Sequence, residues 1–163
     1  VGLDVARFLY LTKSLDTQME FDLELAKEQS EKNPVYYLQY AHARICSILR
    51  KINSKFEIRN PKQIRNSKSP NFKLLNHPNE LILIKQLIRL PEVVEDIAKD
   101  YQVQRLPQYA LDLATIFHQF YRDCRVLTEA RPLSEARLGL VLATKIVLKN
   151  TLSLMGIFAP ERM

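Results

Sequence analysis

Residues 106–127 have the sequence LPQYALDLATIFHQFYRDCRVL, and this stretch is the clearest guide to the fold. Its apolar side chains recur at alternating intervals of four and three residues. They are Leu106, Ala110, Leu113, Phe117, Phe120, Cys124 and Leu127. Since an α-helix completes a turn in about 3.6 residues, this spacing aligns the side chains on one face. The stretch therefore predicts a long helix with an unbroken core-facing stripe.

The pair Asn33-Pro34 marks the start of another helix. An Asn side chain can cap the first turn, and Pro at the first helical position removes no needed hydrogen-bond donor. The apolar stripe that follows predicts an amphipathic helix that ends near Asn53. Further helices are predicted over residues 4–14, from Pro78 to Leu90, from Pro91 through Ile97, and from Ser134 to a left-handed cap at Gly156.

Two segments differ from this amphipathic pattern. The run from Leu81 to Leu90 is apolar on almost every side, which predicts a buried helix. From Met19 to Leu25 apolar and acidic side chains alternate, which is typical of a half-buried strand. The expected fold class is therefore mainly α, a helical bundle with a short α/β fragment at the N-terminus.

Composition excludes several kinds of site. The chain has only three glycines, so it holds no glycine-rich phosphate cradle. Its histidines and cysteines are scattered without metal-ligand spacing, and Cys46 and Cys124 lie on apolar stripes where small buried side chains are expected. No nucleophile with a base and no working pair of carboxylates is apparent. The sequence thus predicts no catalytic residue, metal or cofactor in this chain.

Targeting signals are missing as well. No apolar run approaches the roughly 20 residues that a membrane-spanning helix needs, and no signal peptide is apparent. We therefore expect a cytoplasmic protein that binds no membrane, and we expect it to be a monomer. Because the chain begins with Val1 and not with Met, we also expect it to be a piece of a longer protein.

Positive charge is concentrated between Arg44 and Lys73, where nine Lys or Arg residues accompany one acidic residue, Glu57. Residues 54–78 also hold three prolines among Asn, Ser and Lys, which predicts a long basic loop. Such a patch favours a polyanionic partner, since neutralising phosphates releases counterions. The expected phosphate contacts are Lys62, Arg65 and Lys68. The alternative is a solvated loop whose lysines only keep the chain soluble.

Aromatic and cationic side chains flank two of the core stripes. The two sets, each at i, i+3 and i+7, are Tyr37, Tyr40 and Arg44, and His118, Tyr121 and Arg125. Aromatic rings stack on unpaired bases and Arg contacts phosphates, which is how single-stranded RNA loops are held. The alternative is that the tyrosines complete the core with their hydroxyls at its rim.

Residues 33–44 have the sequence NPVYYLQYAHAR, residues 111–114 are LDLA, and residues 154–163 are LMGIFAPERM. These segments, with Phe21-Asp22-Leu23, Phe120-Tyr121 and Ala136-Arg137-Leu138, closely resemble arginyl-tRNA synthetases. In that family the first segment lies where the catalytic core passes into the helical anticodon-binding domain. The resemblance spans nearly the whole chain, with the basic loop as its weakest part.

The resemblance implies that residues 1–32 end a class I catalytic core and that residues 33–163 form an all-helical anticodon-binding domain of the DALR type. It implies two partners, arginine tRNA and the upstream catalytic domain of the same polypeptide. It also implies that the parent enzyme ligates arginine to this tRNA with ATP and Mg as cofactors. The ATP-binding signatures of class I would lie upstream of Val1, so this chain alone is expected to be inactive.

The resemblance further implies roles for individual residues. Tyr121 and Arg125 match positions that face the anticodon loop, and His118 accompanies them by its spacing. Met163 matches the family's terminal residue near the anticodon, and Tyr109 is a further candidate. Residues expected to pack or dock at the domain junction are Tyr37, Gln39, Tyr40, His42 and Arg44. The alternatives from other classes are a non-catalytic helical module that binds another protein and a non-specific RNA binder.

Overall fold

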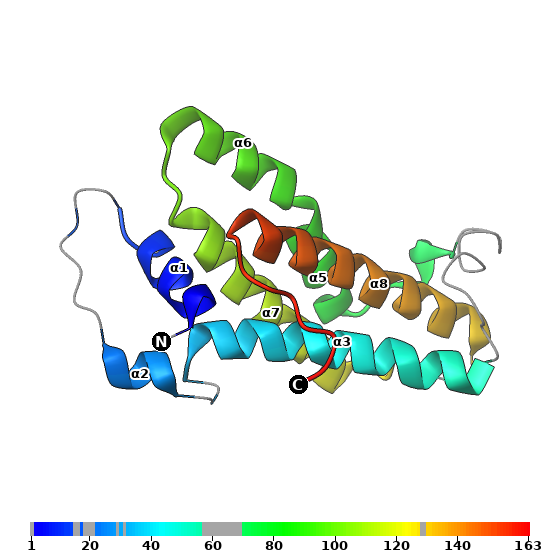
Figure 1. The fold of residues 1–163 in the computed structure, drawn as a ribbon. Helices are drawn as coiled ribbons and strands as arrows, with labels where there is room; N and C mark the ends of the chain where they lie inside the picture. The colour runs from blue at the N-terminus through cyan, green and yellow to red at the C-terminus, as the bar shows by residue number, and fades with distance from the viewer. Residues whose placement is uncertain are drawn as a thin grey trace.

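The computed structural model describes residues 2–14, 17, 22–28, 30, 32–56, 70–127 and 130–163. Within these ranges the regular elements are helices, and no strand occurs. They are α1 (Leu3–Leu11), α2 (Leu23–Lys27), α3 (Pro34–Phe56), the 3₁₀ turn η1 (Phe72–Leu74), α5 (Pro78–Ile88), α6 (Leu90–Asp100), α7 (Arg105–Asp123) and α8 (Arg131–Leu154), as Figure 1 shows. The mainly helical fold class is therefore confirmed.

Helix α7 forms the centre of the bundle, where it contacts α3, α5, α6 and α8. Figure 1 shows α3 and α6 on opposite sides of the molecule. The predicted stripe of α7 is buried, with Leu113, Phe117 and Phe120 fully enclosed, and α3 contributes Ile45 to the same core. Burying a side chain of this size contributes about 1.5–3 kcal/mol, so this stripe is a main source of the bundle's stability.

The helix starts predicted at Pro34 and Pro78 are confirmed. Pro34 opens α3, and the Asn33 carboxamide oxygen accepts the Val35 N–H at 3.1 Å. Pro78 opens α5 after a cap in which the Glu80 carboxylate accepts the backbone N–H of His77 at 2.9 Å. Each start satisfies backbone donors that a helix end otherwise leaves without partners.

The predicted cap at Gly156 is also confirmed. Gly156 has a φ of +68°, a left-handed conformation that glycine adopts without a steric cost. The Ile157 N–H reaches back to the Leu152 carbonyl at 2.9 Å and the Gly156 N–H to the Ser153 carbonyl at 3.0 Å, which is a Schellman motif. From this turn the last residues run across the bundle to α3, where the C-terminus lies (Figure 1).

The strand predicted over Met19–Leu25 is wrong where the structure describes it. Leu23 to Leu25 belong to helix α2, and the Asp22 carboxylate caps that helix by accepting the Glu24 N–H at 3.0 Å. Met19 to Phe21 lie outside the described residues. Alternation favours a strand only where a partner strand is available, and the described part of the chain offers none. Local capping by Asp22 favours the helix instead.

Several helix boundaries or faces differ from expectation. Helix α3 continues to Phe56, and α7 ends at Asp123 because Cys124 is extended, with φ −112° and ψ 112°. Helix α8 begins at Arg131, with Pro132 in its first turn and Ser134 already buried. Helix α5 is not buried all round, since it packs on the bundle along one face only. Its large exposed apolar side chains are Leu81, Ile82 and Ile88, at 44%, 44% and 70%.

Candidate nucleic-acid interface

A pocket of about 390 Å³ opens between α3 and α7. Aromatic and cationic side chains line it: Tyr37, Tyr40 and Arg44 from α3, and His118, Tyr121 and Arg122 from α7. The two helices cross the core together, so their packing brings side chains that are about eighty positions apart in the sequence to one opening. We call these six residues the aromatic pocket.

The rings of the aromatic pocket are held by each other and by the core. The His118 ring centre lies 5.3 Å from that of Tyr37 and 6.2 Å from that of Tyr40. Tyr121 stacks on the fully buried Phe117, with centres 6.2 Å apart and planes inclined by 20°. Offset arrangements of this kind stabilise aromatic pairs. The rings are therefore fixed before any ligand arrives.

Arg44 brings a positive charge to the same pocket. Its guanidinium carbon lies 5.0 Å from the Tyr121 ring centre and 5.8 Å from that of Tyr40, both within cation–π range. Its Nη1 donates a hydrogen bond to the Tyr40 hydroxyl at 3.1 Å. The arrangement presents half-buried rings and a fixed cation to solvent, which suits a flat aromatic group that carries a negative charge nearby.

The structure supports the packing alternative for the tyrosines in part, and base stacking stays a prediction. Tyr37 and Tyr121 are partly buried against the core, as the packing alternative expected, and they still line the pocket. Tyr121 is half-buried and Arg125 is exposed, so neither is inaccessible to a ligand.

Arg125 does not join the aromatic pocket as its spacing predicted. Because α7 ends at Asp123, Arg125 lies beyond the helix, and the i+7 relation to His118 no longer places it on that face. Its backbone carbonyl accepts a hydrogen bond from Arg137 Nη1 at 2.7 Å. Arg137 in turn pairs with the buried carboxylate of Glu80 at 2.6 Å, which fixes the connection between α7 and α8.

Arg122 occupies the pocket in place of Arg125, and the sequence reasoning missed it. The available signal was its position four residues after His118, which puts both side chains on one helix face. The repeated i, i+3, i+7 offsets drew attention to Arg125 instead.

Tyr109 is wrong as a base-contacting candidate. It is 3% exposed, and its hydroxyl donates to the Gln86 carbonyl at 2.8 Å inside the core. Burial raises the pKa of this hydroxyl to about 12. The ring could meet a nucleotide only if α5 and α7 separated.

Met163 does not lie in the aromatic pocket either. It is 56% exposed and borders a second opening of about 810 Å³ beside α1, α2 and the start of α3, together with Asp4 and Gln39. Met163 and Tyr121, both expected to lie near the anticodon, therefore border two different openings.

Gln39 and His42 hold the C-terminal segment. Gln39 Nε2 donates to the Asp4 carboxylate at 2.9 Å and to the Phe158 carbonyl at 3.0 Å. The buried His42 bonds the Pro160 carbonyl through Nδ1 at 2.7 Å, and burial lowers the pKa of its imidazole. These contacts tie α1, α3 and the last residues together.

Glu161 is held beside them. Its carbonyl accepts from Arg50 Nη1 at 2.9 Å, and its carboxylate pairs with Lys145 Nζ at 3.1 Å. We call the set that holds residues 158–161 the tail anchor: Asp4, Gln39, His42, Arg50 and Lys145.

The remaining predictions concern single groups. Cys46 and Cys124 are free and buried, as expected, and burial raises the pKa of both thiols. Among the residues that the structure describes, no cluster of three or more His, Cys, Asp or Glu could hold a metal, and no helix is long and apolar enough to cross a membrane. Lys62, Arg65 and Lys68 lie outside the described residues.

A family model described as the DALR anticodon binding domain matches residues 38–163. The chain belongs to this family. The match runs from Leu38, within α3, to the C-terminus, and so includes the whole aromatic pocket except Tyr37.

Relatives of this DALR domain are named as arginine–tRNA ligases. Those of Salinibacter ruber and Dehalococcoides mccartyi are 47% and 48% identical over 163 residues, which cover 100% of this chain and 28% of each relative. The solved structure of Thermus thermophilus arginyl-tRNA synthetase superposes with a TM-score of 0.80 at 31% identity, covering 99% of this chain and 26% of that protein. The chain thus spans less than a third of the length of these relatives.

Proposed function

We propose that this DALR domain recognises the anticodon stem-loop of arginine tRNA and that the aromatic pocket takes up an unstacked base of the loop. The observation that carries this proposal is the pocket itself, in which three tyrosines, a histidine and two arginines meet at one opening. Base–aromatic stacking together with guanidinium contacts is a recurrent way to hold single-stranded RNA. Within the pocket, Tyr121 and His118 supply stacking surfaces and Arg44 supplies the charge.

The parent protein is proposed to be an arginine–tRNA ligase. The support is that full-length relatives with this name contain the whole chain as 28% of their length. Residues 1–32 then belong to the end of the catalytic core and residues 33–163 to the anticodon-binding domain. ATP and Mg are used by the upstream catalytic domain, so the chain alone binds tRNA without activating arginine. The protein acts in the cytoplasm as a monomer.

The basic residues supply contacts that are independent of base identity. Arg44, Arg50, Lys51 and Lys73 are among the described cations of the 44–73 patch, and the proposed phosphate contacts Lys62, Arg65 and Lys68 lie in the same patch. Phosphate contacts position a nucleic acid while base contacts specify it. Neutralising Lys62, Arg65 and Lys68 together should therefore make the salt dependence of tRNA binding shallower. An unchanged slope would leave this loop with a solubility role only.

The direct test compares this chain with its Tyr121→Ala and Tyr121→Phe variants. Tyr121→Ala should weaken binding of arginine tRNA by about 1–3 kcal/mol, the usual worth of a base–aromatic stack, while Tyr121→Phe should stay close to the parent because it keeps the ring. Affinities come from fluorescence anisotropy, with circular dichroism showing that both variants fold.

A second tRNA sharpens the test. Arginine tRNA with an altered anticodon should bind more weakly than the natural one, and that difference should shrink in Tyr121→Ala. Equal binding of both RNAs would indicate a non-specific RNA binder. Absence of binding to either RNA would favour a protein-interaction module and refute the proposal.

A further inference from the structure

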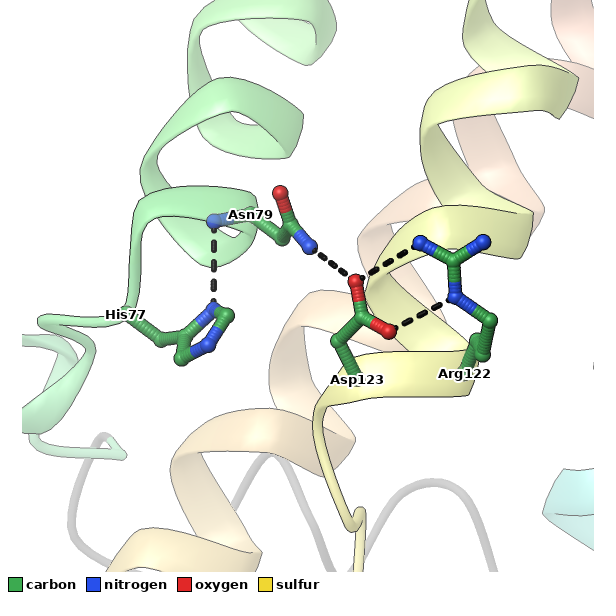
Figure 2. A network of polar contacts seen from close by, with 4 residues as sticks. All are labelled: His77, Asn79, Arg122 and Asp123. Carbon is green, nitrogen blue, oxygen red and sulfur yellow. Dashed lines mark hydrogen bonds and ion pairs between the residues drawn. The ribbon is translucent and has the colours of Figure 1, made fainter.

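Arg122 lines the aromatic pocket, and its guanidinium belongs to a polar network that reaches the start of α5 (Figure 2). The Asp123 carboxylate accepts hydrogen bonds from Arg122 Nε at 2.7 Å and Nη2 at 3.0 Å. The Asn79 carboxamide donates to the same carboxylate at 2.7 Å, and the Asn79 backbone N–H donates to His77 Nδ1 at 3.2 Å. A chain of contacts therefore connects the rim of the pocket with a residue 44 positions away in the sequence.

The network is fixed at its far end. Asn79 belongs to the first turn of α5, whose cap is closed by Glu80. Glu80 is itself 1% exposed in its ion pair with Arg137 of α8. Asn79 consequently lies on backbone that is held by packing of α5 against α7 and by the ion pair with α8, so its side chain presents a defined donor to Asp123.

The carboxylate of Asp123 is kept charged in this setting. Hydrogen bonds from Arg122, and further from Asn79, lower the pKa of Asp123. A charged carboxylate that accepts hydrogen bonds from both Nε and Nη2 fixes the orientation of the guanidinium plane, because the five N–H donors of this group have a rigid planar geometry. Within the part of the chain that the structure describes, Nη1 of Arg122 makes no hydrogen bond or ion pair, and Figure 2 draws this nitrogen outside the dashed contacts.

We propose that Asp123 and Asn79 are positioning residues that orient Arg122 at the rim of the aromatic pocket, so that Nη1 contacts an RNA phosphate beside the stacked base. This inference rests on the proposed function. It adds Arg122 as a binding residue and gives Asn79, which does not line the pocket, a role in RNA affinity.

If only net charge mattered, removing the Asp123 carboxylate would strengthen RNA binding, which is the opposite of what a positioning role predicts. A carboxylate at the rim of a phosphate site repels the ligand, so its removal should strengthen binding if that repulsion were its main effect. If Asp123 instead orients Arg122, its removal should weaken binding even though a negative charge is lost. Asn79 carries no charge, so electrostatics alone predicts no effect of its removal.

The experiment measures arginine tRNA affinity of this chain and of Arg122→Gln, Asp123→Asn and Asn79→Ala at several salt concentrations. Arg122→Gln should weaken binding on the order of fivefold and reduce the salt slope by about one, as expected for one lost phosphate contact. Asp123→Asn and Asn79→Ala should each weaken binding about two- to threefold. In a chain that already carries Arg122→Gln, neither Asp123→Asn nor Asn79→Ala should weaken tRNA binding further. A general loss of structure would instead lower tRNA affinity both with and without Arg122→Gln.

Matched controls remove the same kinds of group, a carboxylate and a carboxamide, at positions outside the network. Asp112 lies on α7, is exposed, and accepts a hydrogen bond from Gln108 at 2.8 Å, so Asp112→Asn removes an equivalent charge away from the network. Asn76→Ala removes an exposed carboxamide three residues before Asn79. Both variants should bind at least as tightly as the parent.

The possible failures are distinguishable. Unchanged or tighter binding by Asp123→Asn or Asn79→Ala would overturn the positioning role. If Tyr121→Ala weakens binding and Arg122→Gln does not, Arg122 is no contact and the inference fails while the proposed function stands. If the parent chain does not bind arginine tRNA, the proposed function fails first.

Discussion

The two edges of α3 are built in different ways. On one edge Tyr40 and Arg44 make ring and guanidinium contacts in the half-open aromatic pocket. On the other edge Gln39 and His42 form hydrogen bonds of 2.7–3.0 Å to the backbone of the C-terminal segment. The first edge keeps its polar atoms among side chains that line an open pocket, and the second uses them to hold the backbone of the C-terminal segment. We infer that the first edge serves binding and the second serves stability.

The largest expected effect comes from removing the C-terminal segment, residues 157–163. The truncation exposes the surface that Ile157 covers and leaves the buried His42 without the Pro160 carbonyl. Losing one buried apolar side chain and one buried hydrogen bond should lower the free energy of unfolding on the order of 3–5 kcal/mol. Urea denaturation followed by circular dichroism measures this change.

The matched control removes only Arg162 and Met163, which are exposed. Its stability should stay within about 0.5 kcal/mol of the parent, as is usual for exposed positions. If both truncations had equal effects, the stabilising role of the tail anchor would be refuted.

The second prediction concerns the turn that starts the C-terminal segment. Gly156→Ala places a Cβ on a residue with φ +68°, where it would also lie 3.4 Å from Arg7 Cδ. A left-handed conformation costs an L-residue roughly 1–2 kcal/mol, so thermal unfolding should show a loss of that size. Gly2→Ala is the control, because Gly2 has φ −68° and an added Cβ there meets nothing within 4 Å. Equal losses in the two variants would contradict this explanation.

The cap at Gly156 could be predicted from the sequence because its signal is local. Glycine directly after a helical run favours a left-handed cap, and Asn before a proline favours a helix start, so Gly156 and Asn33-Pro34 carry their own signals. The apolar stripe of α7 is likewise a property of one segment. These features could be predicted because the residues that decide them are neighbours in the chain.

The end of α7 could not be predicted in this way. Asp123 is held by Asn79, 44 positions away, and the Arg125 carbonyl is held by Arg137, 12 positions away. No proline or glycine marks the stop at Cys124. The choice between Arg122 and Arg125 as the pocket's second cation therefore depends on tertiary contacts that periodicity does not contain. Tyr109 failed for the same reason, since its hydroxyl partner belongs to α5.

The third prediction concerns the pH dependence of stability at the edge of α3 that carries His42. Burial lowers the folded-state pKa of His42 below its ordinary value of 6.5, and Lys145, Lys149 and Cys46 surround the ring together with Glu161. Below pH 6.5 the unfolded chain therefore binds more protons at this residue than the folded chain does. Stability contributed by the neutral ring is present above pH 6.5 and falls as the pH drops, by at most about 1.4 kcal/mol per pH unit.

This loss should be visible between pH 6.5 and about 5, before the carboxylates titrate. His42→Asn keeps a donor for the Pro160 carbonyl and cannot titrate, so its free energy of unfolding should vary less over that range. Urea titrations at pH 5, 6 and 7 measure the difference. A parent whose stability is as flat as that of the variant would show that His42 does not contribute.

The smallest effect is expected on the pocket edge. Tyr40→Phe removes the hydroxyl that accepts from Arg44 Nη1 at 3.1 Å and keeps the ring that the guanidinium covers at 5.8 Å. Because Arg44 is only partly buried, this bond should contribute near the lower end of the usual range, about 0.5 kcal/mol of stability. If the pocket edge serves binding, the free energy of arginine tRNA binding should weaken by more than the free energy of unfolding falls, because Arg44 loses its orientation.

Tyr10→Phe, at a ring that is 67% exposed and outside the pocket, should change neither quantity. A Tyr40→Phe variant that lost stability but bound tRNA normally would reverse the assignment of the two edges.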